Sequence, residues 1–245
     1  MAFFQSDCII LKTYDLADAD RIVVFFSRDH GVVRGVAHGV KRLKSKFGSA
    51  LEQFTESRIS FSHKENVELA TVQGAELLRS SFSVAGDLNL VNELARMANI
   101  LVEFSPPHSP DEKLYRMTAA CFDAIMDDPS GYRSVGVYFD QWILKLAGFL
   151  PNWENCSKCR RQVAARAGLH INGSFESICD VCRPMPGVWE LRASAVELIS
   201  SVRTQSPRSF SANASENTED VATLADIYGR MLDRLTGKGS LSLSG

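Results

Sequence analysis

Residues 20–48 have the sequence DRIVVFFSRDHGVVRGVAHGVKRLKSKFG, and this stretch decides how the first part of the chain is expected to fold. β-Branched and aromatic residues fill positions 21–27, turn residues follow at 28–31, and a valine-rich run covers 32–40. Apolar runs of this kind, bounded by turn residues, are typical of β-strands. The stretch therefore predicts two neighbouring strands that lead into a basic segment punctuated by glycines.

Alternating apolar residues on both sides of this pair indicate three further strands. The five predicted strands cover residues 7–16, 20–27, 32–40, 51–63 and 66–73. Five short strands separated by turns favour a small barrel, and among small barrels they favour the OB type. An SH3-like barrel is the alternative, and strand periodicity does not separate the two.

The basic segment at residues 30–46 contains no Asp or Glu and five cationic side chains, which are Arg34, Lys41, Arg42, Lys44 and Lys46. Cations at adjacent and alternating positions neutralise successive phosphates, and the ring of Phe47 is able to stack on a base. A solvated charged face and a core position for Phe47 are the alternatives. Because the formal net charge is only −2, the local run and not the total charge predicts nucleic-acid contact.

After Gly74 the apolar period changes from two to about 3.6, which indicates helices. The predicted helices cover residues 87–105, 110–127, 131–147, 191–203 and 221–235, with Asp87 as an N-cap. Cys121 lies on the apolar stripe of the second helix, so we expect a core residue there. Residues 204–219 are rich in Ser, Asn and Thr and predict a mobile loop.

Two CxxC pairs, Cys156/Cys159 and Cys179/Cys182, are separated by 19 residues. Each pair fits a tight turn around one side of a metal ion, and four thiolates predict a closed, structural Zn²⁺ site. Disulfides, a redox pair and replacement of one thiol by His170 are the alternatives. The N-terminus lacks the basic region of a signal sequence, so we expect a cytoplasmic protein, in which disulfides do not persist.

Catalytic motifs are missing from the sequence: it has no P-loop, no GxSxG, no HExxH and no HxE partner for a zinc deaminase. We therefore predict no catalytic residue and a binding protein instead of an enzyme. No apolar run approaches the ~20 residues of a membrane span, so no membrane partner is expected. A scaffolding protein and an unrecognised nucleic-acid enzyme remain as alternative functions.

The order of these parts resembles the RecO family of bacterial recombination mediators. The similarity rests mainly on the glycine-punctuated basic segment at 31–47 and on the LAGFLP sequence at 146–151 before the first CxxC pair. It implies an α+β, multidomain protein. Residues 1–75 would form an OB-fold barrel, residues 76–152 and 187–245 a helical domain, and residues 153–186 a zinc-binding insertion with four cysteine ligands.

The resemblance also implies a function in DNA repair and recombination. Members of the family bind single- and double-stranded DNA, anneal complementary strands coated by the single-strand binding protein SSB, and act with RecR to load RecA. DNA contact would come from Arg34, Lys41, Arg42, Lys44 and Lys46, and the four cysteines would hold structural zinc. Residue His38 stands where the family pattern leads us to expect a basic residue. The SSB C-terminal tail would be a partner, and the protein would lie in the bacterial cytoplasm at the nucleoid.

Overall fold

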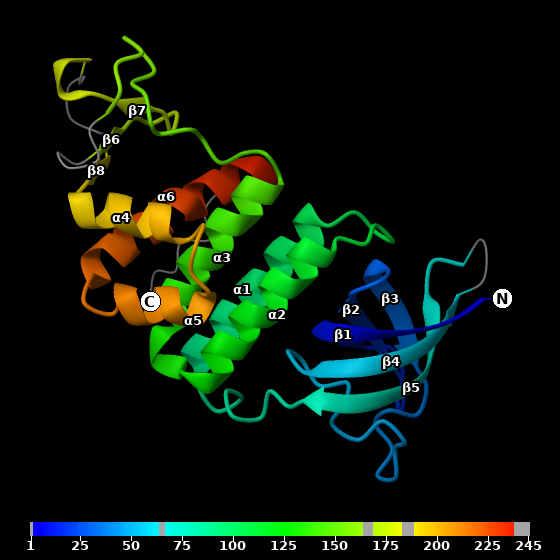
Figure 1. The fold of residues 1–245 in the computed structure, drawn as a ribbon. Helices are drawn as coiled ribbons and strands as arrows, with labels where there is room; N and C mark the ends of the chain where they lie inside the picture. The colour runs from blue at the N-terminus through cyan, green and yellow to red at the C-terminus, as the bar shows by residue number, and fades with distance from the viewer. Residues whose placement is uncertain (1, 64–66, 164–168, 183–188, 238–245) are drawn as a thin grey trace. The chain divides into compact units, whose positions relative to one another are not determined.

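The computed structural model describes residues 2–63, 67–163, 169–182 and 189–237, which divide into two compact units, Met1–Pro129 and Ser130–Gly245 (Figure 1). The start of the fifth predicted strand at residue 66 lies outside the described residues. So do residues 164–168 and 183–186 of the predicted insertion. Each unit is described by itself below.

The first unit begins with a closed barrel of five strands in the order β1-β2-β3-β5-β4. The strands are β1 (Ala2–Asp15), β2 (Arg21–Ser27), β3 (Gly31–Ala37), β4 (Glu56–His63) and β5 (Ala70–Arg79). Neighbours are antiparallel except β3 and β5, which pair in parallel. The five predicted strands are confirmed, although β1 begins earlier, β4 begins later and β5 extends further than the sequence pattern indicated.

Strand β2 is apolar at consecutive positions because both of its faces are buried. Val23 and Phe25 point into the barrel, whereas the ring of Phe26 lies 5.7 Å from that of Tyr115 on a covering helix. That helix is α2 (Glu112–Asp127), and it follows α1 (Leu88–Phe104). The barrel core consists of Cys8, Ile10, Val23, Phe25, Val33, Ala37, Phe47, Leu51, Ile59, Phe61, Ala70 and Val72.

Each of the two helices begins directly after an aspartate that caps it. Asp87 accepts hydrogen bonds from two backbone N–H groups of α1, which confirms the predicted N-cap, and Asp111 caps α2 by accepting one hydrogen bond, from the Leu114 N–H. Cys121 is fully buried on α2, as its position on the apolar stripe predicted. Both helices thus carry a face of buried, mainly apolar residues.

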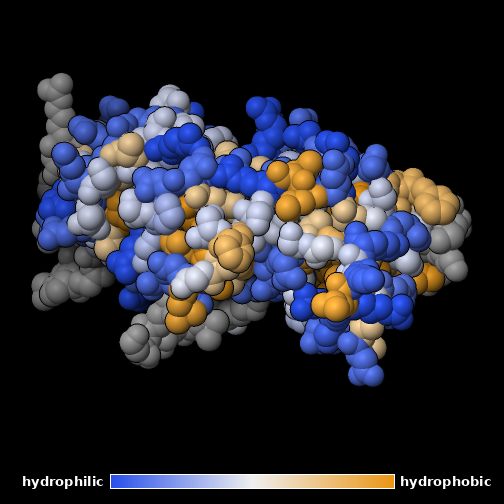
Figure 2. Space-filling model, turned by 90° about the horizontal axis from the view of Figure 1, so that it is seen from below, coloured by the Kyte–Doolittle hydropathy of each residue, from blue (hydrophilic) through white to orange (hydrophobic). Residues whose placement is uncertain are grey.

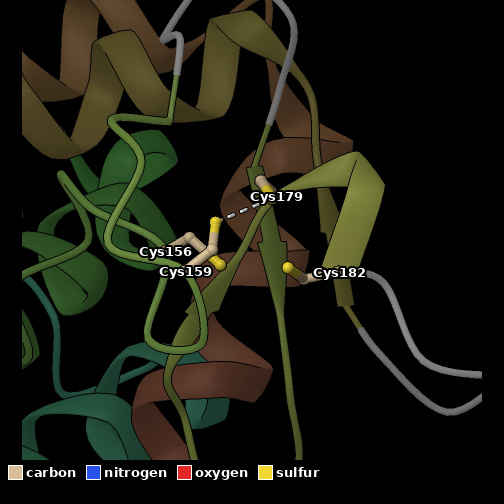
Figure 3. Close-up of side chains that lie close together, drawn as sticks. All are labelled: Cys156, Cys159, Cys179 and Cys182. Atoms are coloured by element: carbon tan, nitrogen blue, oxygen red, sulfur yellow. Dashed lines mark hydrogen bonds between the residues drawn. The ribbon is translucent and has the colours of Figure 1, made fainter.

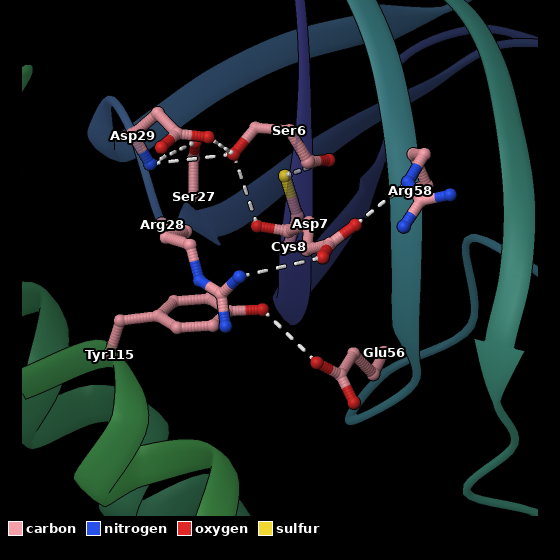
Figure 4. A network of polar contacts seen from close by, with 9 residues as sticks. All are labelled: Ser6, Asp7, Cys8, Ser27, Arg28, Asp29, Glu56, Arg58 and Tyr115. Atoms are coloured by element: carbon pink, nitrogen blue, oxygen red, sulfur yellow. Dashed lines mark hydrogen bonds and ion pairs between the residues drawn. The ribbon is translucent and has the colours of Figure 1, made fainter. Parts of the chain in front are cut away.

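A polar network connects the strands with α2 (Figure 4). The Asp7 carboxylate accepts a hydrogen bond of 2.9 Å from Arg58 and forms an ion pair of 3.8 Å with Arg28. The Arg28 guanidinium lies over the ring of Tyr115, whose hydroxyl donates a 3.1 Å hydrogen bond to Glu56. Partial burial is the main reason why the pKa of Glu56 is raised above its usual range.

Gly31, at the start of β3, is required by both its backbone and its surroundings. Its φ is +66°, and a Cβ atom there would lie 2.4 Å from the carbonyl oxygen of Ser109. Only glycine combines this left-handed backbone with so close an approach. The predicted turn at residues 28–31 is therefore also a packing contact with the α1–α2 connection.

The second unit contains α3 (Tyr132–Leu146), α4 (Ala193–Ser201), α5 (Pro207–Ala214) and α6 (Thr218–Thr236). The predicted mobile loop at 204–219 is wrong, because α5 lies within it. Ser206 caps α5, Pro207 occupies its first turn, and Phe210 is fully buried. At the centre of the unit, the buried Tyr228 hydroxyl donates a 3.0 Å hydrogen bond to Gln141 of α3.

A small sheet in the order β7-β6-β8 follows α3 in the same unit. Its strands are β6 (Leu169–Ile171), β7 (Ser177–Ile178) and β8 (Trp189–Leu191). Trp153 attaches the sheet to the helices: its indole N–H donates a 2.8 Å hydrogen bond to Phe175 O, and its ring stacks on Tyr228 at 6.1 Å. The sequence pattern predicted the insertion but not this sheet.

On the face drawn in Figure 2, hydrophobic residues gather in separate patches between hydrophilic ones. Apolar residues that are mostly exposed include Phe3, Leu43, Phe82 and Leu88. Among the described parts of the chain, none of the helices combines the length and the apolar character needed to cross a bilayer.

Candidate nucleic-acid interface and metal centre

The basic segment follows β3 as a series of turns, and the loop between β1 and β2 holds its base. The Gly39 N–H donates a 2.8 Å hydrogen bond to the Asp20 carboxylate, and the Lys41 N–H donates one of 3.1 Å to Ala19 O. Gly39 has φ of +70°, so the chain reverses there at little steric cost. Two loops that are far apart in sequence thereby meet on the barrel.

Although the segment has no acid of its own, it has acids beside it in space. Lys41 Nζ lies 3.1 Å from Asp15, His38 Nδ1 lies 2.7 Å from Asp20, and Arg34 lies 3.9 Å from Glu68. The hydrogen bond from Lys41 lowers the pKa of Asp15. The pKa of Asp20 is lowered mainly by the hydrogen bond from the Gly39 N–H and, to a smaller extent, by the hydrogen bond with His38. These carboxylates compete with any phosphate for the same cations.

The tip of the segment is exposed to solvent. Arg42 and Lys44 are exposed, and Leu43 between them is fully exposed. Lys46 Nζ donates a 2.6 Å hydrogen bond to Gln73 O, which ties the end of the segment to β5. Arg42 and Lys44 are therefore the predicted residues best placed to meet a phosphate. The sequence analysis did not single out Leu43 as an exposed residue. The only sign of it in the sequence is that an apolar residue stands between Arg42 and Lys44 in a basic run.

Phe47 requires a correction. Its side chain is only 3% exposed and lies in the barrel core, and Lys46 Nζ lies 5.0 Å from its ring centroid. A ring in this position presents no free face to a base. We therefore withdraw Phe47 from the predicted DNA contacts and keep the five basic residues. Its apolar side chain fixes the end of the basic segment to the barrel.

The four cysteines of the second unit converge at one point (Figure 3). All four sulfur atoms lie within 4.8 Å of one another, and Cys159 Sγ is 3.6 Å from Cys179 Sγ. A tetrahedral ion with Zn–S bonds of about 2.3 Å would separate its sulfurs by about 3.8 Å, so the spacing fits with little adjustment. The cluster could hold a metal ion.

Backbone turns present these sulfurs to one another. The Arg160 N–H donates to Cys156 O, and the Cys182 N–H donates to Cys179 O. Backbone N–H groups of Cys159 and Cys179 lower the pKa of the Cys156 thiol to about 6, whereas hydrogen bonds with those two cysteines raise the pKa of Cys182 to about 12. The cluster therefore favours a partly ionised state, which suits a cation bound among thiolates.

Two protein-family models match this chain along most of its length. The model for the N-terminal part of recombination protein O matches residues 1–81, and the model for its C-terminal part matches residues 88–243. The chain belongs to the RecO family. This confirms the resemblance drawn mainly from the basic segment and from the LAGFLP sequence before the first CxxC pair.

Curated RecO proteins from two bacteria support the same assignment. The DNA repair protein RecO of Koribacter versatilis is 31% identical over 166 residues, which cover 68% of this chain and 67% of that protein. The DNA repair protein RecO of Rubrobacter xylanophilus is 29% identical over 183 residues, which cover 75% of this chain and 73% of that protein. Membership of the RecO family places the chain in DNA repair and recombination.

Proposed function

We propose that this protein binds single- and double-stranded DNA through its barrel, anneals complementary strands coated by SSB, and acts with RecR to load RecA. The observation that supports the proposal most is the exposed basic tip at Arg42 and Lys44, projecting from a closed barrel in a RecO-family chain. The protein acts by binding, and no bond-breaking step is required of it.

The barrel is proposed to be an OB fold. Its support is the set of five strands in which β1 pairs with both β2 and β4 and β3 closes against β5. Such barrels bind oligonucleotides through one face and its flanking loops. We likewise keep as a proposal the division into a barrel at 1–75, a helical domain at 76–152 and 187–245, and a cysteine insertion at 153–186.

Annealing follows from charge neutralisation. Two DNA strands repel each other through their phosphates, and a cationic surface that neutralises both lowers this barrier and raises their local concentration. Binding to the SSB C-terminal tail would bring the protein to coated strands, and no catalytic side chain takes part in pairing. Phosphates must displace Asp15 and Glu68 from Lys41 and Arg34, so these ion pairs set part of the affinity.

The ion among the four cysteines is proposed to be Zn²⁺ in a structural role. Four thiolates in a tetrahedral arrangement suit Zn²⁺ and leave no coordination position for water or substrate. Zinc would stabilise the small sheet, because Cys179 and Cys182 follow β7 directly. It would therefore stabilise the second unit and leave DNA contact by the barrel to the basic segment.

The test is the annealing of SSB-coated complementary strands, measured as the rate of duplex formation with and without the protein. We expect the protein to accelerate annealing and the combined variant Lys41→Ala, Arg42→Ala, Lys44→Ala, Lys46→Ala to abolish the acceleration. The matched control removes four exposed cations elsewhere, namely Lys113, Arg116, Arg133 and Arg203. Equal rates in the variant and the wild type would refute the assignment of DNA contact to the basic segment.

A direct binding measurement isolates the phosphate contacts. The logarithm of affinity for a single strand should fall linearly with the logarithm of salt concentration, by about 0.7 per neutralised phosphate. The combined four-residue variant should therefore flatten this slope by up to about 2.8. An unchanged slope would show that the basic segment is a solvated face, as expected of a scaffolding protein.

A further inference from the structure

A cavity of about 350 Å³ lies in the second unit, between the small sheet and α6. It is lined by Gly173, Phe175, Trp189, Arg230, Asp233 and Arg234. None of these residues belongs to the basic segment or to the cysteine cluster. The cavity therefore has a composition of its own: two aromatic rings, two guanidinium groups and one carboxylate.

The guanidinium groups are stacked over the rings. Arg230 Cζ lies 5.6 Å from the ring centroid of Trp189, and Arg234 Cζ lies 4.9 Å from that of Phe175. The two rings are 5.7 Å apart and inclined by only 23°. Because Arg230 and Arg234 are one helical turn apart on α6, they place two flat cations side by side over two nearly parallel rings.

Hydrogen bonds hold the two arginines in place but do not use all of their guanidinium N–H donors. Asp226 accepts from Trp189 Nε1 at 2.8 Å and from Arg230 Nε at 2.9 Å, while Arg234 donates to Gly173 O at 3.3 Å. A guanidinium has five N–H donors. The Arg230 side chain is 61% exposed, and within the described ranges these contacts leave most of its donors for a ligand.

Flat cations on aromatic rings suit a ligand that offers both anionic oxygens and flat faces. Single-stranded nucleic acid offers both: phosphates pair with arginine, and splayed bases stack on guanidinium planes and aromatic rings. An acidic peptide with an apolar end fits less well, because the guanidinium groups cover the rings that would receive the apolar side chain. The carboxylate of Asp233 also opposes a purely anionic ligand.

We propose that this cavity is a second binding site for single-stranded nucleic acid. Arg230 and Arg234 receive a phosphate, and a base stacks on a guanidinium that rests on Trp189 or Phe175. The inference rests on the proposed function in one respect, that the barrel holds another strand. With two separate sites, one molecule holds two strands at once and raises the effective concentration of each for the other.

The test is a bridging assay on the full chain with strands that do not pair. Biotinylated oligothymidylate on beads captures the protein, and retention of a second, fluorescent oligothymidylate is measured. The variant Arg230→Gln, Arg234→Gln should lower retention at least about fivefold, while the affinity for one free strand changes by no more than about threefold. The matched control Arg133→Gln, Arg203→Gln removes two exposed cations of the same unit and should bridge normally.

Tryptophan fluorescence gives a local readout. Oligothymidylate should quench the emission of the wild type, and the quenching should be largely lost in Trp189→Phe, which keeps an aromatic ring. It should persist in the variant that lacks the four cations of the basic segment. Quenching that is unchanged in Trp189→Phe would place the nucleic acid elsewhere and overturn the proposal.

The outcomes separate the two proposals. Normal bridging by the Arg230/Arg234 variant refutes the second site and leaves the barrel untouched. Unchanged single-strand affinity in the basic-segment variant refutes the barrel site instead. If the Arg230/Arg234 variant bridges normally but loses binding of a fluorescent acidic peptide with an apolar C-terminus, the cavity is a peptide site, and the nucleic-acid assignment is wrong.

Discussion

Lys41 Nζ lies 3.1 Å from the carboxylate of Asp15, a residue at the end of β1 that also forms a 3.3 Å ion pair with Arg21. A lysine of the proposed DNA-binding segment is therefore already paired with an acid in the free protein. Replacement of Asp15 by Asn removes this competitor. We expect the affinity for single-stranded DNA to rise about two- to fivefold, as is typical of one exposed ion pair, and the salt dependence to steepen.

The control for this prediction is Asp18→Asn, which changes the same loop and the same net charge. Asp18 is exposed, and the described part of the chain shows no ion pair to it. The affinity for single-stranded DNA should rise slightly in both variants because each loses one negative charge. Only Asp15→Asn also releases Lys41 from its ion pair. Equal gains in fluorescence-anisotropy titrations would mean that the ion pair does not limit binding.

Phe47 provides a second prediction, since its burial separates packing from DNA contact. Phe47→Leu keeps most of the apolar volume and removes the aromatic face. We expect DNA affinity within about twofold of the wild type, whereas the loss of a stacked base would cost about 1–3 kcal/mol, or about 5- to 150-fold.

Urea unfolding gives the complementary measurement on Phe47. Phe47→Ala leaves a cavity in the barrel core and should lower the free energy of unfolding by about 3–5 kcal/mol, and Phe47→Leu by less. If Phe47→Leu loses tenfold or more in DNA affinity while remaining stably folded, our withdrawal of Phe47 from the DNA contacts is wrong.

The basic segment also shows where prediction from sequence ends. Alternation and turn residues are local signals, so the strand run of residues 21–27 and the Asp87 cap were predictable. The pairing of Asp15 with Lys41 and of Asp20 with His38 depends on β2 pairing with both β1 and β3, which brings the end of β1 near the start of the basic segment. The basic segment contains no acidic residue, but acidic residues from other parts of the chain lie next to it in the folded protein.

Composition misled the prediction at α5. Residues 204–219 are polar enough to suggest a loop, yet Phe210 and Ala214, one turn apart, are both buried. The cap Ser206 and the following Pro207 were the available signal, because both favour the start of a helix. The small sheet had no comparable signal: β6 and β8 have three residues each and β7 only two.

Removal of zinc provides a third prediction, on the second unit. Purified protein should contain about one zinc per chain, as four thiolates hold one tetrahedral ion, and a strong chelator should lower the melting temperature of the wild type. When free zinc is about 100 times the dissociation constant, the bound ion contributes about 2.7 kcal/mol to the free energy of unfolding. Cys156→Ser should contain less zinc, melt earlier and lose most of its response to the chelator.

Lys158→Gln is the control for the zinc prediction, because this exposed residue lies in the same turn and supplies no sulfur. The single-strand affinity of the basic segment should persist in Cys156→Ser at temperatures where the protein is folded. A Cys156→Ser variant that folds normally but has lost its affinity for single-stranded DNA would contradict the structural role of the cluster.

Glu56 provides the fourth prediction, on the pH dependence of stability. Its pKa is raised mainly by burial, even though the Tyr115 hydroxyl donates to the carboxylate, so the folded protein holds this proton more tightly than the unfolded chain. The contribution of Glu56 to the free energy of unfolding therefore falls as the pH rises from about 4.5 through the raised pKa. Glu56→Gln keeps an acceptor for Tyr115 and removes the buried charge.

We expect Glu56→Gln to melt at a higher temperature than the wild type at about pH 7, and the difference to shrink as the pH approaches about 4. Glu76→Gln changes an exposed carboxylate on the neighbouring strand β5 and should show no gain of this kind. Melting curves between about pH 4 and pH 8 decide the question. A melting temperature of Glu56→Gln below that of the wild type at about pH 7, with a deficit that shrinks toward about pH 4, would reverse the sign of the linkage. It would mean that Arg28 and Tyr115 stabilise the Glu56 carboxylate by more than burial destabilises it.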